Sequence, residues 1–124
     1  MPFMKKLLLL LIVLCAVSCK KYVVSFEQPT DMKLDNLKLE VFLDKEKVQD
    51  INLKATEELP TYETVGLSTS GEGKHQLQIK AKDTTFNFDI KYPEEKYIMV
   101  TAHINNKGKL HVGILKQNYK FRFR

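Results

Sequence analysis

The chain has 124 residues, of which 44% are hydrophobic and 28% charged, with a formal net charge of +5 and no Trp. This composition is typical of a folded globular protein and excludes a disordered, collagen-like or multi-span membrane chain. The length allows one domain and excludes most enzyme folds that place two lobes around a cleft.

The first 18 residues have the pattern of a cleaved signal peptide. Lys5 and Lys6 precede an apolar run from Leu7 to Val17. This run would rise only about 16 Å as a helix, whereas a bilayer core needs about 20 apolar residues, so it is too short for a permanent span. We expect residues 1–18 to be removed as a signal helix, and we exclude them from the fold.

The end of this run resembles a lipobox, the cleavage and acylation signal of bacterial lipoproteins. Ala16-Val17-Ser18-Cys19 places small residues before a Cys, although the family usually has Leu where Ala16 stands. The resemblance implies cleavage before Cys19, acylation of its sulfur and attachment to a membrane through the acyl chains. Cys15 would leave with the signal peptide, so the mature chain could form no intramolecular disulfide.

The residues around the predicted cleavage site also indicate where the protein is located in the cell. Removal of residues 1–18 takes away two lysines and no acid, so the formal charge falls from +5 to +3, which makes nucleic acid a poor candidate partner. In lipoproteins that this chain resembles, Lys after the acylated Cys permits transfer to the outer membrane, and early acids accompany surface export. Here Lys20 and Lys21 follow Cys19, and the first acid is Glu27. We expect an outer-membrane lipoprotein whose domain faces the periplasm.

Residues 19–36 are expected to hold the acylated Cys and a tether, and within them Tyr22–Phe26 has the residue types of a first strand. From residue 37 to residue 124 apolar and polar residues alternate, which indicates strands rather than helices. We expect strands over residues 37–43, 48–53 and 62–67, with a turn at Asp44-Lys45-Glu46. The hydrophobic phase slips between Val48 and Ile51, which indicates a bulge.

Two hairpins are expected in the second half of the chain. A turn at Asp83-Thr84 would place Ala81 opposite Phe86 and Leu77 opposite Ile90. A three-residue loop at residues 106–108, with Gly108 at the position that needs positive φ, would place Ile104 opposite Leu110. A last strand over residues 119–124 would form an edge that could accept a partner strand.

About seven short strands with no helix after the signal predict an all-β fold, a small Ig-like antiparallel β-sandwich. Phe42–Val48 and Gly73–Ile79 resemble the strand–turn–strand and G-x-H-x-L-x-I elements of PEGA-like and other small Ig-like envelope modules, a likeness that covers residues 37–104. The short signal that ends in Ser-Cys-Lys-Lys resembles those of small Bacteroidetes lipoproteins. Neither resemblance carries a catalytic residue over.

No catalytic, cofactor or metal site is expected. His103 and His111 would be directly opposed on the second hairpin, but two ligands do not make a structural zinc site, so an exposed pair is expected. His75 is expected at a partly buried strand end near Tyr92. Residues 66–71 have the glycine spacing of a phosphate loop, yet Glu72 stands where the loop needs Lys.

The outward face of the second hairpin offers a candidate partner patch, formed by Tyr97, Met99 and Leu115. The sequence therefore predicts a lipid-anchored, non-enzymatic envelope module that binds or scaffolds a protein partner. Two alternatives stay open. One is an immunity-type or secretion-system-associated lipoprotein, like those of type VI secretion. The other is a carbohydrate- or peptidoglycan-binding module, which the absence of Trp platforms disfavours.

Overall fold

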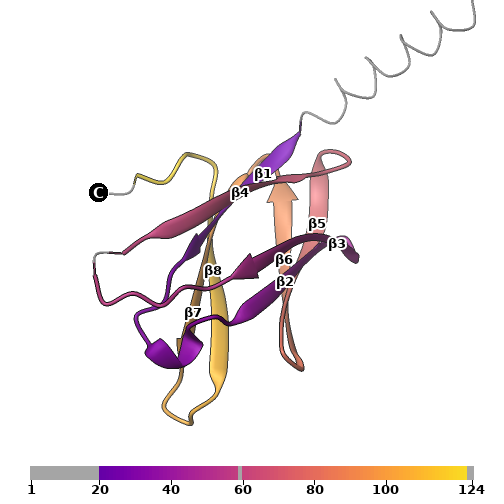
Figure 1. Cartoon of the computed structure of the whole chain (residues 1–124). Helices are drawn as coiled ribbons and strands as arrows, with labels where there is room; N and C mark the ends of the chain where they lie inside the picture. The colour runs from indigo at the N-terminus through magenta and orange to yellow at the C-terminus, as the bar shows by residue number, and fades with distance from the viewer. Residues whose placement is uncertain (1–19, 59, 123–124) are drawn as a thin grey trace, which may run out of the picture.

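The computed structural model describes residues 20–58 and 60–122, which form two four-stranded β-sheets packed face to face (Figure 1). The elements follow the order β1 Lys21–Glu27, 3-10 helix η1 Met32–Leu34, β2 Lys38–Leu43, β3 Glu46–Asn52, β4 Tyr62–Ser68, β5 Gly73–Ala81, β6 Thr84–Tyr92, β7 Tyr97–Ile104 and β8 Leu110–Gln117. The prediction of an all-β sandwich is confirmed, with eight described strands where about seven were expected.

One sheet has the strand order β4-β1-β7-β8 and the other has the order β3-β2-β5-β6. Neighbouring strands run antiparallel except β1 and β7, which are parallel. Short turns join the antiparallel pairs β2–β3, β5–β6 and β7–β8. The pairs β1–β4, β2–β5 and β1–β7 join segments that are far apart along the chain and depend on tertiary packing.

The core lies between the inner faces of the two sheets. Alternate residues of each central strand point inward, as the two-residue period requires. The largest fully buried side chains are Tyr22, Phe26, Leu39, Ile51, Leu53, Leu67, Leu77, Ile79, Ile90, Ile98, Val24 and Val41. Both sheets contribute to this list, so neither could be removed without exposing the other.

The sandwich begins earlier than the expected boundary at residue 37. Residues 21–27, assigned mainly to the tether, form β1, which lies between β4 and β7 at the centre of its sheet. Tyr22, Val24 and Phe26 are at most 1% exposed. The alternation of these three apolar residues is therefore a core pattern, and only Lys20 separates Cys19 from β1.

The first hairpin has the predicted bulge, and its turn is one residue shorter than predicted, because Glu46 already belongs to β3 and pairs with Leu43. Asp44 and Lys45 have φ of +49° and +71°, so they connect β2 to β3 in two residues. Val41 pairs with Gln49 and Phe42 with Lys47, which leaves Val48 without a partner in the ladder. This bulge restores the inward direction of Ile51.

The β5–β6 hairpin differs from the expected register by two residues. Ala81 pairs with Thr84, so the turn is Lys82-Asp83, with Lys82 at φ +55°. A shift of two keeps the same faces inward, so alternation alone cannot distinguish the registers. The expected register would place Pro93, which has no N–H, opposite Lys74, whereas the observed ladder ends at Tyr92.

The β7–β8 hairpin has the predicted register, with Ile104 opposite Leu110 and Gly108 at φ +75°. Asn105 closes the loop because its Oδ1 accepts hydrogen bonds from the backbone N–H groups of Lys107 and Lys109, at 2.9 and 3.0 Å. The expected last strand is wrong for its described part. β8 ends at Gln117, and residues 118–122 lie outside any strand, while residues 123 and 124 lie outside the described residues.

The two ends of the sandwich carry different loops. β1 starts opposite the end of β4 and beside the start of β7. The end of the sandwich where β1 begins therefore carries the β2–β3 turn, the β4–β5 loop, the β6–β7 loop and residues 118–122. We call this the proximal end. The distal end carries η1, residues 53–61, the β5–β6 turn and the β7–β8 loop.

The position of β1 predicts that the sandwich cannot fold without it. A chain that begins at Asp31 would lose the central strand of one sheet and three fully buried side chains, each of which contributes about 1.5–3 kcal/mol when buried. We expect this chain to lack cooperative urea unfolding, whereas a chain that begins at Lys20 shows a single transition. The same cooperative urea transition in both chains would show that the sandwich does not need β1.

Candidate functional site

A groove lies at the distal end between segments that are far apart in the sequence. One wall contains η1 and the start of β2, and the facing walls are the β5–β6 turn and the β7–β8 loop. It consists of two hollows, of about 370 and 590 Å³, that share Lys33, Leu37 and Lys82. We call it the distal groove.

The wall that contains η1 is fixed by short-range contacts. Asp31 caps η1, because its Oδ1 accepts a hydrogen bond of 2.9 Å from the backbone N–H of Lys33. Leu34, 3% exposed, fastens η1 to the core. Asn36 has φ +64° and turns the chain into β2, with its N–H donating to the carbonyl of Leu53 at 2.8 Å. Lys33 and Lys38 therefore flank a rigid bend.

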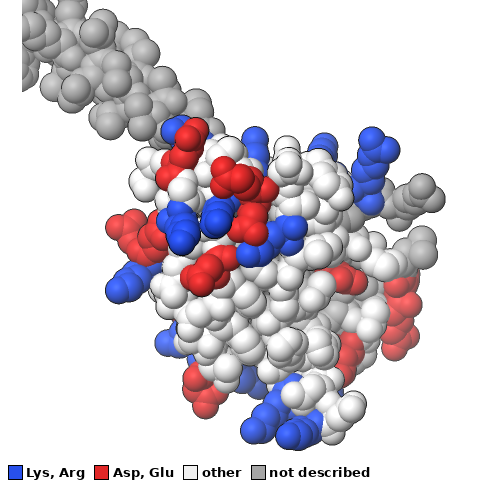
Figure 2. Space-filling model, turned by 180° about the vertical axis from the view of Figure 1, so that it is seen from behind, with Lys and Arg blue, Asp and Glu red and all other residues white. Residues whose placement is uncertain are grey.

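Five exposed lysines line the distal groove. They are Lys33, Lys38, Lys80, Lys82 and Lys109. In the described part of the chain, none of their ammonium groups has a carboxylate oxygen within 4.0 Å. Figure 2 shows Lys and Arg side chains at the lower end of the molecule, opposite the grey N-terminal residues. Because like charges repel, an anion at this end would relieve their mutual repulsion.

The acids of the groove do not balance these lysines. Asp35 accepts a hydrogen bond from the N–H of Ala55 at 3.0 Å, so this carboxylate is already engaged. Glu40 lies 3.9 Å from the ammonium group of Lys47, outside the groove. Asp83, in the β5–β6 turn, is the third acid. The distal groove therefore has an excess of positive charge.

Apolar side chains form the floor of the larger hollow. They are Leu34, Leu37, Ala81, Ile104 and Leu110. Leu34 and Ala81 belong to the buried core, and the other three are partly buried. A ligand in this hollow would contact an apolar base and a cationic rim, an arrangement that suits a chain with alternating apolar and acidic groups.

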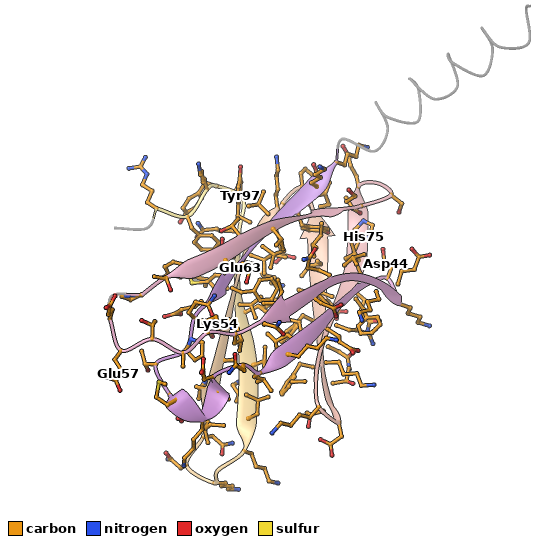
Figure 3. The ribbon with its side chains drawn as sticks, in the orientation of Figure 1. Asp44, Lys54, Glu57, Glu63, His75 and Tyr97 are labelled. Carbon is orange, nitrogen blue, oxygen red and sulfur yellow. The ribbon has the colours of Figure 1, made fainter. Side chains whose placement is uncertain are left out.

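A second cluster lies at the proximal end around His75. Its Nδ1 is 2.6 Å from Oδ2 of Asp44, and its Nε2 is 2.7 Å from the carbonyl oxygen of Gly71 and 3.0 Å from Oγ1 of Thr69. Figure 3 shows Asp44 and His75 side by side, one from the β2–β3 turn and one from β5. We call Asp44, Thr69, Gly71 and His75 the His75 cluster.

The geometry of the His75 cluster favours the doubly protonated imidazolium. Both ring nitrogens face oxygen atoms that can only accept, so both need a hydrogen. Burial by itself lowers the pKa of His75, but the hydrogen bonds to Asp44 and Gly71 and the Asp44 charge outweigh it and raise this pKa. Burial likewise raises the pKa of Asp44, but the N–H of Gln76 and the His75 ring outweigh it and lower that pKa.

The distances from Thr69 to His75 to Asp44 resemble those of a nucleophile, a base and an orienting acid. The cluster lacks the free base that such chemistry needs. Because Nε2 faces the Gly71 carbonyl at 2.7 Å, it carries a hydrogen and cannot take one from Thr69. Thr69 is also only 5% exposed. The contacts instead tie the β4–β5 loop to the β2–β3 turn.

A buried tyrosine lies behind the His75 cluster. The Tyr22 ring makes edge contacts with His75 and Tyr92, at centroid distances of 5.9 and 5.3 Å. Its hydroxyl is buried and, within the described residues, has no hydrogen-bond partner. Burial and the nearby Asp44 charge raise the pKa of Tyr22, so it stays neutral and its ring acts as packing.

The structure brings together the residues of the predicted partner patch. Met99 pairs with Leu115 across the β7–β8 ladder, and Tyr97 lies two residues from Met99 on the same face. Leu115 is 56% exposed, and Tyr97 and Met99 are half-buried. Their outward placement agrees with the predicted geometry, while their role as a binding surface stays a prediction.

The structure also places the two histidines of this hairpin as predicted. His103 and His111 are directly opposed and exposed, with ring centroids 5.1 Å apart. Within residues 20–58 and 60–122, no group of three or more His, Cys, Asp or Glu side chains is arranged to hold a metal ion. Cys19, the predicted acylation site, lies outside the described residues.

Sequence reasoning missed the distal groove and the contacts of His75. The alternation of apolar and polar residues places Lys38 and Lys80 on polar strand faces, but it does not show that both lie at the same end of the sandwich. The available signal is that Lys80 and Lys82 lie in or next to one hairpin turn and Lys107 and Lys109 in or next to another. That signal becomes useful only when both turns are known to lie at one end of the sandwich.

No protein-family model matches this sequence, and no curated protein and no solved structure matches it either. In the described ranges, no helix is both long and apolar enough to cross a membrane. The resemblances to lipoproteins and to PEGA-like modules therefore stay predictions.

The His75 cluster predicts stability that depends on pH. A raised pKa of His75 stabilises the fold below its unfolded-state pKa, and this contribution is lost as the pH rises through the folded-state pKa. The lowered pKa of Asp44 has the opposite effect, because the stability that its carboxylate contributes is lost as the pH falls through the folded-state pKa. We expect the melting temperature to fall as the pH rises above about 6.5, the ordinary pKa of a histidine.

The variant His75→Gln should flatten this decline in melting temperature, because it removes the titrating group. The matched control is His111→Gln, which removes an exposed imidazole from the β7–β8 hairpin and should keep the wild-type slope. A wild-type slope in His75→Gln would show that another group causes the pH dependence.

Proposed function

We propose that this chain is a lipid-anchored, non-enzymatic module of the bacterial cell envelope, acylated at Cys19, that binds an acidic, partly apolar segment of a protein partner in the distal groove. The observation that carries the proposal is the position of the groove. Five lysines that have no carboxylate partner among the described residues surround an apolar floor at the end of the sandwich opposite the start of β1. The groove would therefore face away from the membrane.

The short distance from Cys19 to β1 supports this orientation. One residue, Lys20, stands between them, and an extended residue spans at most about 3.6 Å. The proximal end would therefore lie next to the lipid headgroups, without the long tether that the sequence predicted. A partner would meet the distal end first.

The expected location remains the outer membrane, with the domain facing the periplasm. Its support is the sequence that follows Cys19, where Lys20 and Lys21 stand in place of an inner-membrane retention signal or early acids. In this orientation the acidic segment would belong to a periplasmic partner or to a periplasmic part of one.

Acylation is tested first. Globomycin, which inhibits lipoprotein signal peptidase, should cause the uncleaved precursor to accumulate, and Cys19→Ala should release the protein from the membrane fraction. The matched control is Cys15→Ala, which lies in the predicted signal peptide and should leave processing and membrane attachment intact. A mature N-terminus at any residue other than Cys19 would contradict the proposal.

The groove is tested with a fluorescent peptide of alternating Glu and Leu. The double variant Lys33→Glu/Lys82→Glu should weaken binding at least about tenfold, because two attractive charges become repulsive. The matched control Lys45→Glu/Lys74→Glu makes the same charge change at exposed positions of the proximal end, and its affinity should stay close to that of the wild type.

Fluorescence anisotropy measures the affinities, and a peptide of alternating Lys and Leu serves as the reference ligand. Thermal unfolding establishes that both double variants are folded. An equal loss of affinity for the acidic peptide in the two double variants would mean that net charge, rather than the groove, drives binding. No binding of the acidic peptide would contradict the proposed ligand class.

A further inference from the structure

We propose that one corner of the proximal end is a docking surface for an anionic phospholipid bilayer. The corner consists of the outer face of β7 and β8 near Leu115 together with residues 118–122 and the lysines at the starts of β1 and β7. This inference rests on the proposed function, since the acyl chains on Cys19 bring the surface to the membrane.

The topology brings both described ends of the chain to this corner. β1 starts beside the start of β7, because Val23 pairs with Tyr97, and Tyr97 in turn pairs with Gln117 at the end of β8. In Figure 1 the start of β1 and the C-terminal segment both lie at the upper end of the molecule. Residues 118–122 therefore lie at the end where Cys19 would enter the bilayer.

Positive charge gathers on this corner. Its cationic residues are Lys20, Lys21, Lys96, Lys120 and Arg122. Two acids of the proximal end are already paired, Glu95 with Lys116 at 2.9 Å and Asp44 with His75 at 2.6 Å. The others are Glu94 in the β6–β7 loop, Glu72 in the β4–β5 loop and Glu46 at the start of β3. Cations held within a few ångströms of a headgroup layer are attracted to anionic lipid phosphates.

The corner also exposes the apolar groups that a bilayer interface accepts. Tyr119 is 67% exposed and Leu115 is 56% exposed, the two largest values among the exposed large hydrophobic side chains described. The Gln117 side chain donates to the carbonyl of Tyr119 at 2.9 Å and holds the chain as it leaves β8. Tyr119, Lys120 and Arg122 thus present the aromatic and cationic groups that are enriched at membrane interfaces.

The surface differs from the distal groove in shape and position. The groove is walled by three separate parts of the chain and lies at the end opposite the start of β1, whereas the hollow at the corner, of about 620 Å³, is lined by residues 119–122 alone. A lipid surface fits the corner, because it needs exposed side chains rather than a groove with facing walls. Contact with lipid would also explain why Leu115 is exposed. From the sequence, Leu115 was expected to contact a protein partner.

The test uses the mature acylated protein in liposomes that contain phosphatidylglycerol. Because the chain has no Trp, the variant Tyr119→Trp carries a single reporter. We expect its emission to shift to shorter wavelength and to be quenched by lipids brominated on their acyl chains. The matched reporter Met32→Trp, in η1 at the distal end and 54% exposed, should show neither change.

A charge variant tests the electrostatic part of the proposal. Lys120→Glu in the Tyr119→Trp background should reduce the quenching, and high salt should reduce it in the parent protein, because screening weakens attraction to the lipid phosphates. Lys107→Glu, in the distal β7–β8 loop, makes the same charge change and should leave the quenching unchanged.

The outcomes separate the two proposals. Protein that floats with the liposomes while the reporters at positions 119 and 32 behave alike would overturn the docking surface and leave the anchor intact. Protein that carries no acyl group and stays in solution would overturn the proposed function, and the docking surface with it. Equal effects of Lys120→Glu and Lys107→Glu would overturn the assignment of the cationic corner.

Discussion

The placement of β1 between β4 and β7 is the constraint on which the rest of the structure depends. Its three inward side chains, Tyr22, Val24 and Phe26, are fully buried, and its two neighbours come from the middle and the end of the chain. The parallel pairing with β7 has no short connection to favour it, so packing must offset the entropy of closing a long loop. Because β1 follows Cys19 so closely, this one packing event also determines which end of the sandwich would face the membrane.

The two ends therefore have different proposed tasks although both are cationic. At the proximal end the positive charges lie beside exposed Tyr119 and Leu115, and the hollow there is lined by one segment, residues 119–122. At the distal end the lysines surround a hollow with an apolar floor. A lipid surface is flat and extended, and a peptide segment is narrow, so the shapes of the two cationic surfaces assign them to different ligands more clearly than their charge does.

Local sequence patterns predicted most of the strands, because each strand alternates in hydrophobicity and each turn has its own residues. The bulge at Val48 and the loop ending at Gly108 were predicted because both leave a signal within a few residues. The register of β5 and β6 was not, since a shift of two residues keeps the same side chains inward. There the absence of an N–H on Pro93 was the stronger signal.

The sites depend on long-range pairing that local patterns do not contain. Asp44 and His75 are 31 residues apart, and they meet because β2 pairs with β5, with Leu43 opposite Leu77. The distal groove needs η1, the β5–β6 turn and the β7–β8 loop at one end, which requires the order of strands in both sheets. The tether was assigned from its closeness to Cys19, although the alternation of Tyr22, Val24 and Phe26 already favoured a strand.

The position of the His75 cluster links the stability of the fold to the proposed anchor. The cluster ties together two loops of the proximal end, and its contacts require a protonated His75. An anionic membrane surface has a potential of about −30 mV, which concentrates protons near the headgroups and favours the charged form of a nearby imidazole. Next to such a surface His75 would hold its proton to a higher bulk pH than in free solution. The β4–β5 loop and the β2–β3 turn would then be most firmly connected when the protein is anchored, so the membrane would stabilise the same end of the sandwich that it holds.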